Sequence, residues 1–179
     1  MTIEMVCPID SLSLVELEIG GINYGYKSAL AGNEYIDINC PEGDNWQLLK
    51  RSVCRYRFES AGFYYNCSGA LINNTNNDGT PYFLTANHCV STDEEAESAL
   101  FYFNYERDDC KGIAPSDFQT QKLSGASLVA SAESSDFSLL KLNQVPPPNY
   151  KTVYAGWDRT QNERSHVVSI NHPEGIDKK

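Results

Sequence analysis

The chain has 179 residues, of which 41% are hydrophobic and 21% charged, so it can fold around a sizeable core and does not have the composition of a disordered chain. A formal net charge of -10 leaves no broad basic surface to neutralise phosphates, so neither nucleic acid nor an anionic membrane surface is expected as a partner. The sequence has no run of 18 apolar residues, and its first ten residues lack the basic and apolar regions of a signal peptide.

Residues 1–34 are interpreted as an N-terminal arm, in which residues 14–19 could form a strand. From Tyr35 onward, short aromatic and β-branched segments alternate with turn residues, which predicts an antiparallel all-β barrel or sandwich. The expected strands lie within residues 35–40, 52–60, 63–72, 81–89, 99–106, 126–132, 137–145, 152–158 and 166–172.

The clearest hairpin spans residues 67–86, because the loop "NNTNNDGT" supplies Asn, Asp and Gly between two apolar segments. It would place His88 at the end of a strand. Residues 93–103 could open with one helical turn before a strand. The three prolines of Val145–Tyr150 favour a stiff, extended connector and a domain boundary.

The six cysteines show no C-x-x-C spacing, which disfavours a zinc ribbon or a thioredoxin-type site. An even number of well-separated cysteines is typical of disulfides and of an oxidising compartment, so we expect a secreted, cell-surface or periplasmic protein that has been separated from its leader. A Cys67–Cys89 bridge would close a loop of roughly 20 residues around His88, worth about 3 kcal/mol.

Asp136 lies just before an apolar strand, so its carboxylate should be partly buried and should need a donor such as an imidazole N–H. Taken alone, His88 could be a polar residue at a strand end and Asp136 a turn cap. Five sequence blocks favour a catalytic role over these structural ones, and two of the blocks contain His88 and Asp136 themselves. In order along the chain they are "NCPEGDNWQ" (39–47), "CSGALINNT" (67–75), "YFLTANHC" (82–89), "SSDFSLLKL" (134–142) and "YAGWDR" (154–159).

Together these blocks resemble trypsin-like serine peptidases, and among them the bacterial lysyl endopeptidase branch. The resemblance implies an antiparallel Greek-key β-barrel, with the first barrel at residues 35–145 and a connector and the opening strands of an incomplete second barrel at residues 146–179. It also implies that His88 is the general base and Asp136 the acid that orients its imidazole.

The same resemblance implies the disulfides Cys67–Cys89 and Cys40–Cys110. Cys7 and Cys54 are left over, and they could pair with each other or remain free thiols. A Cys89 thiolate activated by His88 is a conceivable alternative, but adjacent residues of a strand point to opposite faces.

The nucleophile is not found in this sequence, because the family's Gly-Asp-Ser-Gly or Gly-Ser-Ser-Gly turn does not occur in it. Ser68 and Ser124 precede glycines, but neither has a glycine two positions earlier. We therefore expect the chain to be inactive alone, as a fragment or one half of a serine endopeptidase that cleaves proteins or peptides after lysine. The missing C-terminal half would be its partner, and a noncatalytic binding module is the alternative.

No metal or organic cofactor is expected. His166 and His172 lie six residues apart, which is about 20 Å along a strand and too far for shared coordination. The acidic run at residues 93–97 is expected to be a solvated surface.

Overall fold

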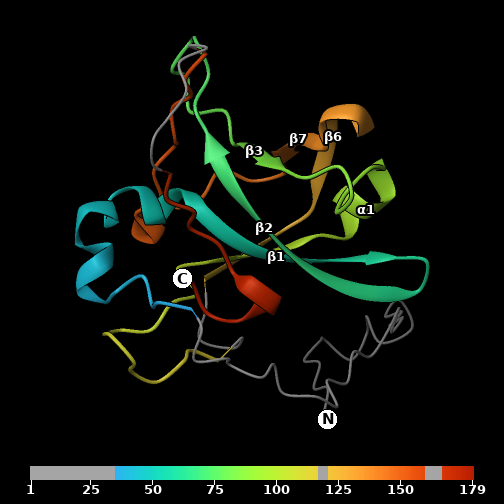
Figure 1. Cartoon of the computed structure of the whole chain (residues 1–179). Coiled ribbons are helices and arrows are strands. Elements are labelled where there is room, and N and C mark those ends of the chain that lie inside the picture. The colour runs from blue at the N-terminus through green and yellow to red at the C-terminus, as the bar shows by residue number, and fades with distance from the viewer. Residues whose placement is uncertain (1–34, 117–120, 160–166) are drawn as a thin grey trace, which may run out of the picture.

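The structure is a computed structural model that describes residues 35–116, 121–159 and 167–179. Seven antiparallel strands form one curled sheet in the order β5-β4-β1-β2-β3-β7-β6 (Figure 1). The strands are β1 (Val53–Ser60), β2 (Phe63–Ile72), β3 (Tyr82–Thr85), β4 (Leu100–Phe103), β5 (Gln121–Ser124), β6 (Ala126–Ala132) and β7 (Phe137–Leu142). The all-β prediction is confirmed, and the sheet is a half-barrel of the trypsin-like kind.

The predicted hairpin is the pairing of β2 with β3, in which Leu71 faces Phe83. Three of the expected strands do not form, namely those at residues 35–40, 152–158 and 166–172, the last of which is described from residue 167 onward. Residues 35–40 form no strand, because short 3-10 turns at Pro41–Trp46 and Leu49–Ser52 follow and the polar side chains there bind other segments. The short, mostly polar strand β5 was not predicted at all, since it depends on pairing with β4 rather than on its own pattern.

The predicted helical turn is α1 (Asp93–Ser98), and a capping box fixes its start. The Thr92 hydroxyl accepts the Glu95 N–H, and the Glu95 carboxylate accepts the Thr92 N–H, both at 3.2 Å. Asp93 also accepts the N–H of Leu128 at 2.8 Å, which joins the helix to β6. The acidic run is therefore partly structural, and not only a solvated surface as predicted.

Aromatic side chains form a large part of the buried core. Tyr56 is fully buried and stacks on Phe101 at 5.5 Å, while Phe83 meets Phe101 edge-on at 5.0 Å. Such pairs add roughly 1 kcal/mol each beyond the area they bury. In the described residues, these core side chains come from β1, β3 and β4, and β3 is the strand that leads to His88.

Two disulfides form as the resemblance implied, Cys67–Cys89 and Cys40–Cys110. Of the two alternatives left open for Cys54, a bridge to Cys7 or a free thiol, the structure shows the free thiol. Cys54 is a free thiol, fully buried, with its Sγ 3.0 Å from the carbonyl oxygen of Arg55. Cys7 lies outside the described residues. Burial raises the pKa of the Cys54 thiol, so this sulfur is unreactive.

Residues 146–159 and 167–179 form no strand of their own. A 3-10 turn at Pro148–Tyr150 ends the proline connector, and an isolated parallel bridge joins Ile72 to Ala155. The boundary proposed at this connector, and the second barrel expected beyond it, stay predictions. Within the described residues, the helices are too short and too polar to span a membrane.

We predict that Gly69→Ala lowers the free energy of unfolding by about 1–3 kcal/mol, the usual cost of overpacking. A Cβ at Gly69 would lie 2.4 Å from the ring of Phe83 and 2.6 Å from the carbonyl oxygen of Leu84. Urea denaturation measures the change. Gly156→Ala is the matched control, because its Cβ meets no atom within 4 Å. Equal stability of the two variants would contradict the close packing of β2 against β3.

Candidate active site

The pairing of β3 with β7 brings the two predicted site residues together. Thr85, the last residue of β3, faces Ser138 of β7 in an antiparallel register. His88 follows Thr85 by three residues and Asp136 precedes Ser138 by two, so both lie beyond the same end of this strand pair. This one register therefore brings together two residues that are 48 positions apart in the sequence.

The Asp136 carboxylate binds His88 through both of its oxygens. Oδ2 lies 2.8 Å from the imidazole Nδ1, and Oδ1 accepts the backbone N–H of His88 at 2.9 Å. A carboxylate cannot donate a hydrogen bond when ionised, so the proton of the neutral imidazole is on Nδ1 and Nε2 is left as the basic nitrogen. This is the arrangement that a general base requires.

The His88 contacts also keep the carboxylate ionised. The His88 backbone N–H, followed by the His88 side chain, lowers the pKa of Asp136, and the N–H of Asn87 contributes in the same direction. Asp136 adopts the left-handed conformation, with φ 48°, as the residue that ends the short turn Glu133–Ser135. Aspartate tolerates this conformation better than most residues, and the bend directs the side chain toward His88.

The prediction that the Asp136 carboxylate is partly buried was wrong. The side chain of Asp136 is 52% exposed and that of His88 is 71% exposed. Both residues lie in turns beyond the strand ends, outside the aromatic core, so the hydrogen bonds rather than burial hold them. The pair is therefore open to solvent.

Three contacts fix the turn that carries His88. The Cys67–Cys89 disulfide joins it to β2, and the Ser138 hydroxyl donates to the carbonyl of Val90 at 2.5 Å, which joins it to β7. The carbonyl of Ala86 accepts the N–H groups of Cys89 and Val90 at 3.2 and 3.3 Å. Because Cys89 is in a disulfide, the alternative of a Cys89 nucleophile is excluded.

A buried chain of hydroxyl groups supports the same turn and was not found in the sequence. The Thr85 hydroxyl donates to the carbonyl of Ser68 at 3.0 Å and lies 2.8 Å from the Tyr56 hydroxyl. Thr85 belongs to the "TANHC" block, so the block could have suggested the threonine. Tyr56 lies on a separate strand and has no motif of its own.

Neither candidate serine is placed to act with His88. The Ser68 hydroxyl accepts the backbone N–H of His172 at 2.8 Å, and Ser124 pairs with Leu100 in the edge strand β5. His172 is buried and His166 lies outside the described residues. In the part of the chain that the structure describes, no group of three His, Cys, Asp or Glu side chains is placed to hold a metal.

We predict that His88→Ala raises the pKa of Asp136, because the imidazole hydrogen bond and charge are lost. The pKa should stay below the value of a free aspartate, since the backbone N–H groups of residues 87 and 88 remain. A carboxyl group whose pKa is lowered in the folded state stabilises the protein above about pH 4, and this stabilisation is lost on further acidification. The variant has less of it, so it should lose less stability in acid. Carboxyl ¹³C NMR titration measures the pKa; an unchanged value would contradict the contact.

We also predict that the double substitution Cys67→Ala and Cys89→Ala lowers the free energy of unfolding by about 3 kcal/mol, as expected for a closed loop of this length. The Cys40–Cys110 disulfide closes a separation of 70 residues rather than 22. Removing it by Cys40→Ala and Cys110→Ala should therefore lower the free energy of unfolding somewhat more, by about 4 kcal/mol. Only the first pair should change the NMR signals of the His88 ring. A shift of that ring in the second variant alone would reverse the assignment of roles.

Two comparisons with known proteins bear on the family of the chain. The family model described as "Lysyl endopeptidase, C-terminal domain" matches residues 30–179. A curated lysyl endopeptidase of Pseudomonas aeruginosa is 31% identical over 198 aligned residues, which cover 100% of this chain and 42% of the relative. The chain therefore spans less than half the length of that relative. The match of the family model over most of the sequence, with the relative, shows that the chain belongs to the lysyl endopeptidase family.

Proposed function

We propose that the chain supplies the base and the acid of a serine endopeptidase. The single observation that carries this proposal is the hydrogen bond of 2.8 Å between His88 Nδ1 and Asp136 Oδ2. It fixes the tautomer in which Nε2 can remove the proton of a serine hydroxyl. Family membership supports the assignment, because the printed name of the relative is that of an endopeptidase.

In the proposed mechanism, His88 Nε2 accepts the proton as the serine oxygen attacks the peptide carbonyl carbon. The imidazolium that forms is stabilised by the Asp136 carboxylate, which stays ionised. His88 then donates the proton to the departing amine nitrogen and leaves an acyl-enzyme, which water hydrolyses by the same route in reverse. No step requires a metal or an organic cofactor.

The nucleophile is proposed to come from polypeptide outside this chain. Ser68 is engaged by His172, and Ser124 lies in an edge strand. The exposed faces of His88 and Asp136 leave space for a second barrel that would bring a serine to Nε2. The C-terminal half of the same protease is the partner proposed here, and the chain should be inactive without it.

Peptide bonds after lysine are the proposed substrate, following the name of the family. The net charge of -10 supports this weakly, since a negative field attracts cationic peptides. We further propose secretion or a periplasmic or cell-surface location, because the two disulfides are compatible with an oxidising compartment. The second candidate, a noncatalytic binding module, is favoured only by the engagement of Ser68.

The direct test is a chimera in which this chain replaces the matching region of the Pseudomonas relative. We expect it to hydrolyse a lysyl amide substrate, and His88→Ala to lower kcat by at least about 10⁴-fold. Asp136→Asn should lower kcat by about 10⁴-fold, because the imidazole would adopt the wrong tautomer. The exposed Lys141→Gln is the matched control and should retain activity. A folded chimera with no activity, or full activity without His88, would contradict the proposal.

The chain alone provides the complementary measurement. A fluorophosphonate probe reacts with activated serines, so the purified 179 residues should show no serine labelling, whereas the chimera should be labelled at a serine outside this sequence. Robust labelling of a serine within the chain would show that the nucleophile is not external.

A further inference from the structure

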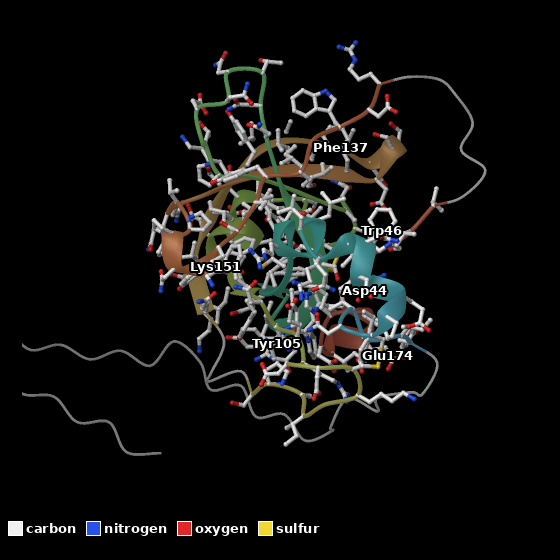
Figure 2. All side chains as sticks on the ribbon, turned by 90° about the vertical axis from the view of Figure 1, so that its left-hand side faces the viewer. Asp44, Trp46, Tyr105, Phe137, Lys151 and Glu174 are labelled. Atoms are coloured by element: carbon white, nitrogen blue, oxygen red, sulfur yellow. A yellow bond between two sulfur atoms is a disulfide. The ribbon has the colours of Figure 1, made fainter. Side chains whose placement is uncertain are left out.

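The segment of residues 167–179 packs against the barrel, where the backbone N–H of His172 binds the Ser68 hydroxyl of β2. Its backbone is held by hydrogen bonds of Lys178 N–H to Tyr105 O at 2.9 Å and of Ile38 N–H to Lys178 O at 3.4 Å. Figure 2 shows Glu174 of this segment and Tyr105 in the same lower part of the molecule. The segment therefore bridges the start of the domain and the loop after β4.

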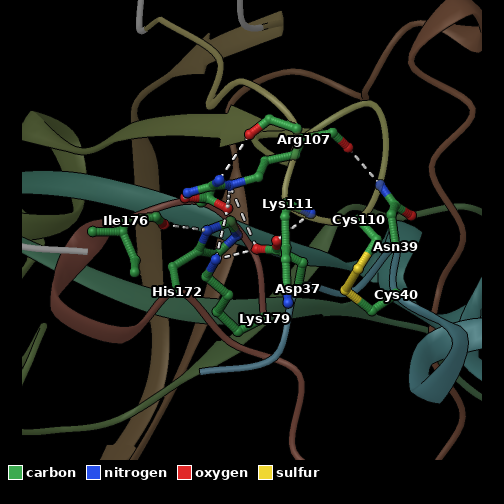
Figure 3. A network of polar contacts seen from close by, with 11 residues as sticks. Asp37, Asn39, Cys40, Arg107, Cys110, Lys111, His172, Ile176 and Lys179 are labelled. Atoms are coloured by element: carbon green, nitrogen blue, oxygen red, sulfur yellow. Dashed lines mark hydrogen bonds and ion pairs between the residues drawn. A yellow bond between two sulfur atoms is a disulfide. The ribbon is translucent and has the colours of Figure 1, made fainter. Parts of the chain in front are cut away.

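Ion pairs fasten the end of this segment (Figure 3). Asp177 accepts from Arg107 Nε at 2.8 Å and pairs with Lys179 Nζ at 3.0 Å, and Lys179 also reaches Asp37. The fully buried Lys178 pairs with Glu106 at 3.0 Å. Asp37, Asp177 and Glu106 therefore each form an ion pair with a lysine or an arginine.

His172 is a buried titratable group in the middle of the same segment. Its side chain donates from Nδ1 to the carbonyl of Ile176 at 3.0 Å, and its backbone N–H donates to Ser68 Oγ at 2.8 Å. The residue is only 4% exposed, and Nε2 has no hydrogen-bond partner in the described part of the chain. The ring of Tyr105 lies 6.1 Å away.

The charges that face His172 are mostly positive. Lys178 of the same segment and Arg55 of β1 both oppose a charge on the ring, and Asp177 is the anion that favours one. Asp177 is committed to Arg107 and Lys179. A proton on Nε2 would therefore be a buried donor without an acceptor, placed close to two cations.

We propose that neutral His172 is an acid-released lock that holds residues 167–179 on the barrel. In the docked segment the imidazole is uncharged, and protonation of Nε2 favours the released segment, in which water can solvate the ring. The lock is built from the enclosed imidazole, which lies beside the Tyr105 ring and donates to the Ile176 carbonyl, and from the His172 backbone N–H, which donates to the Ser68 hydroxyl. It does not depend on whether His88 acts as a base.

The sign of the pH dependence follows from the two states. Burial, with Lys178 and then Arg55, places the pKa of docked His172 well below 6.5, whereas the released ring has an ordinary pKa near 6.5. The docked state binds fewer protons, so docking is complete above about pH 6.5 and weakens as the pH falls below it, by up to tenfold per pH unit.

Two carboxylates that hold the segment, Glu106 and Asp177, stay ionised in that window because the pKa of each is lowered. Burial alone would raise the pKa of Glu106, but Lys178 and Lys50 outweigh it and the net pKa lies below the usual value. Asp177 behaves in the same way, because Arg107 and Lys179 outweigh its burial. Between pH 7 and about pH 5 the change in docking is therefore assigned to His172.

Release would reach the candidate active site through Ser68. This residue directly follows Cys67, whose disulfide holds the turn of His88, and its carbonyl accepts the Thr85 hydroxyl. Loss of the His172 contact would remove the hydrogen bond to the Ser68 hydroxyl. Ser68, the residue that binds the lock, is therefore next to Cys67, whose disulfide holds the His88 turn.

The test uses a variant in which His172 is the only histidine, made by His88→Gln and His166→Gln. Hydrogen exchange, corrected for the intrinsic rate at each pH, measures the protection of the residue 172 and 178 amides against that of β1 amides. We expect protection of the segment to fall at least tenfold between pH 7.5 and pH 5.0, with the β1 amides unchanged. Constant protection of the segment across this range would overturn the proposal.

Adding His172→Gln gives the matched control without a histidine. Glutamine can donate to the Ile176 carbonyl but cannot become charged, so segment protection should not depend on pH from 7.5 to 5.0. The same tenfold fall in this variant would contradict the lock. If the glutamine variant does not dock, NMR titration of His172 in the single-histidine protein provides the test. An imidazole that becomes charged near pH 6.5 while the segment stays protected also overturns the proposed lock.

Discussion

The antiparallel register of β3 against β7 is the constraint on which the candidate site depends. It sets Thr85 opposite Ser138, so the turn after one strand meets the turn before the other. His88 and Asp136 gain their contact from this pairing and not from burial, since both side chains are exposed. The Cys67–Cys89 disulfide and the Ser138–Val90 hydrogen bond then stop the His88 turn from moving relative to the sheet.

Buried charge has a different place in this molecule from the charge at the candidate site. Lys178 is a buried cation that donates to the Lys50 carbonyl and the Glu106 carboxylate of other segments, whereas the buried His172 is uncharged and donates to the Ile176 carbonyl of its own segment. Removing one partner of such a network usually costs several kcal/mol, because the other charge is left buried. The network specifies one docking position for residues 167–179, and the neutral imidazole makes that position sensitive to acid.

The sequence predicted those features that depend on local pattern. The hairpin of residues 67–86 had alternating apolar segments and a loop of turn residues, and the blocks around His88 and Asp136 carried the site. Strand β5 and the absence of a strand at residues 35–40 could not be predicted, because both depend on contacts with distant segments. The exposure of Asp136 was misjudged for a related reason: the strand after it is buried, but the turn that carries it is not.

Contacts across long separations in sequence were also beyond prediction. Lys178 looks like a solvated residue in a basic, polar ending, yet it pairs with Glu106 across 72 positions. The Tyr56 hydroxyl supports Thr85 from another strand, with no sequence signal to join them. Such contacts show how the family's short blocks are held in place by residues outside the blocks.

The most direct measurement of the proposed base is the tautomer of His88, read from long-range ¹H–¹⁵N correlation of the imidazole in the purified chain at pH 8. The hydrogen bond to Asp136 predicts the Nδ1–H tautomer with an unprotonated Nε2, and Asp136→Asn should abolish this preference. A dominant Nε2–H tautomer in the unmodified chain would contradict the base-and-acid pair on which the proposed function rests.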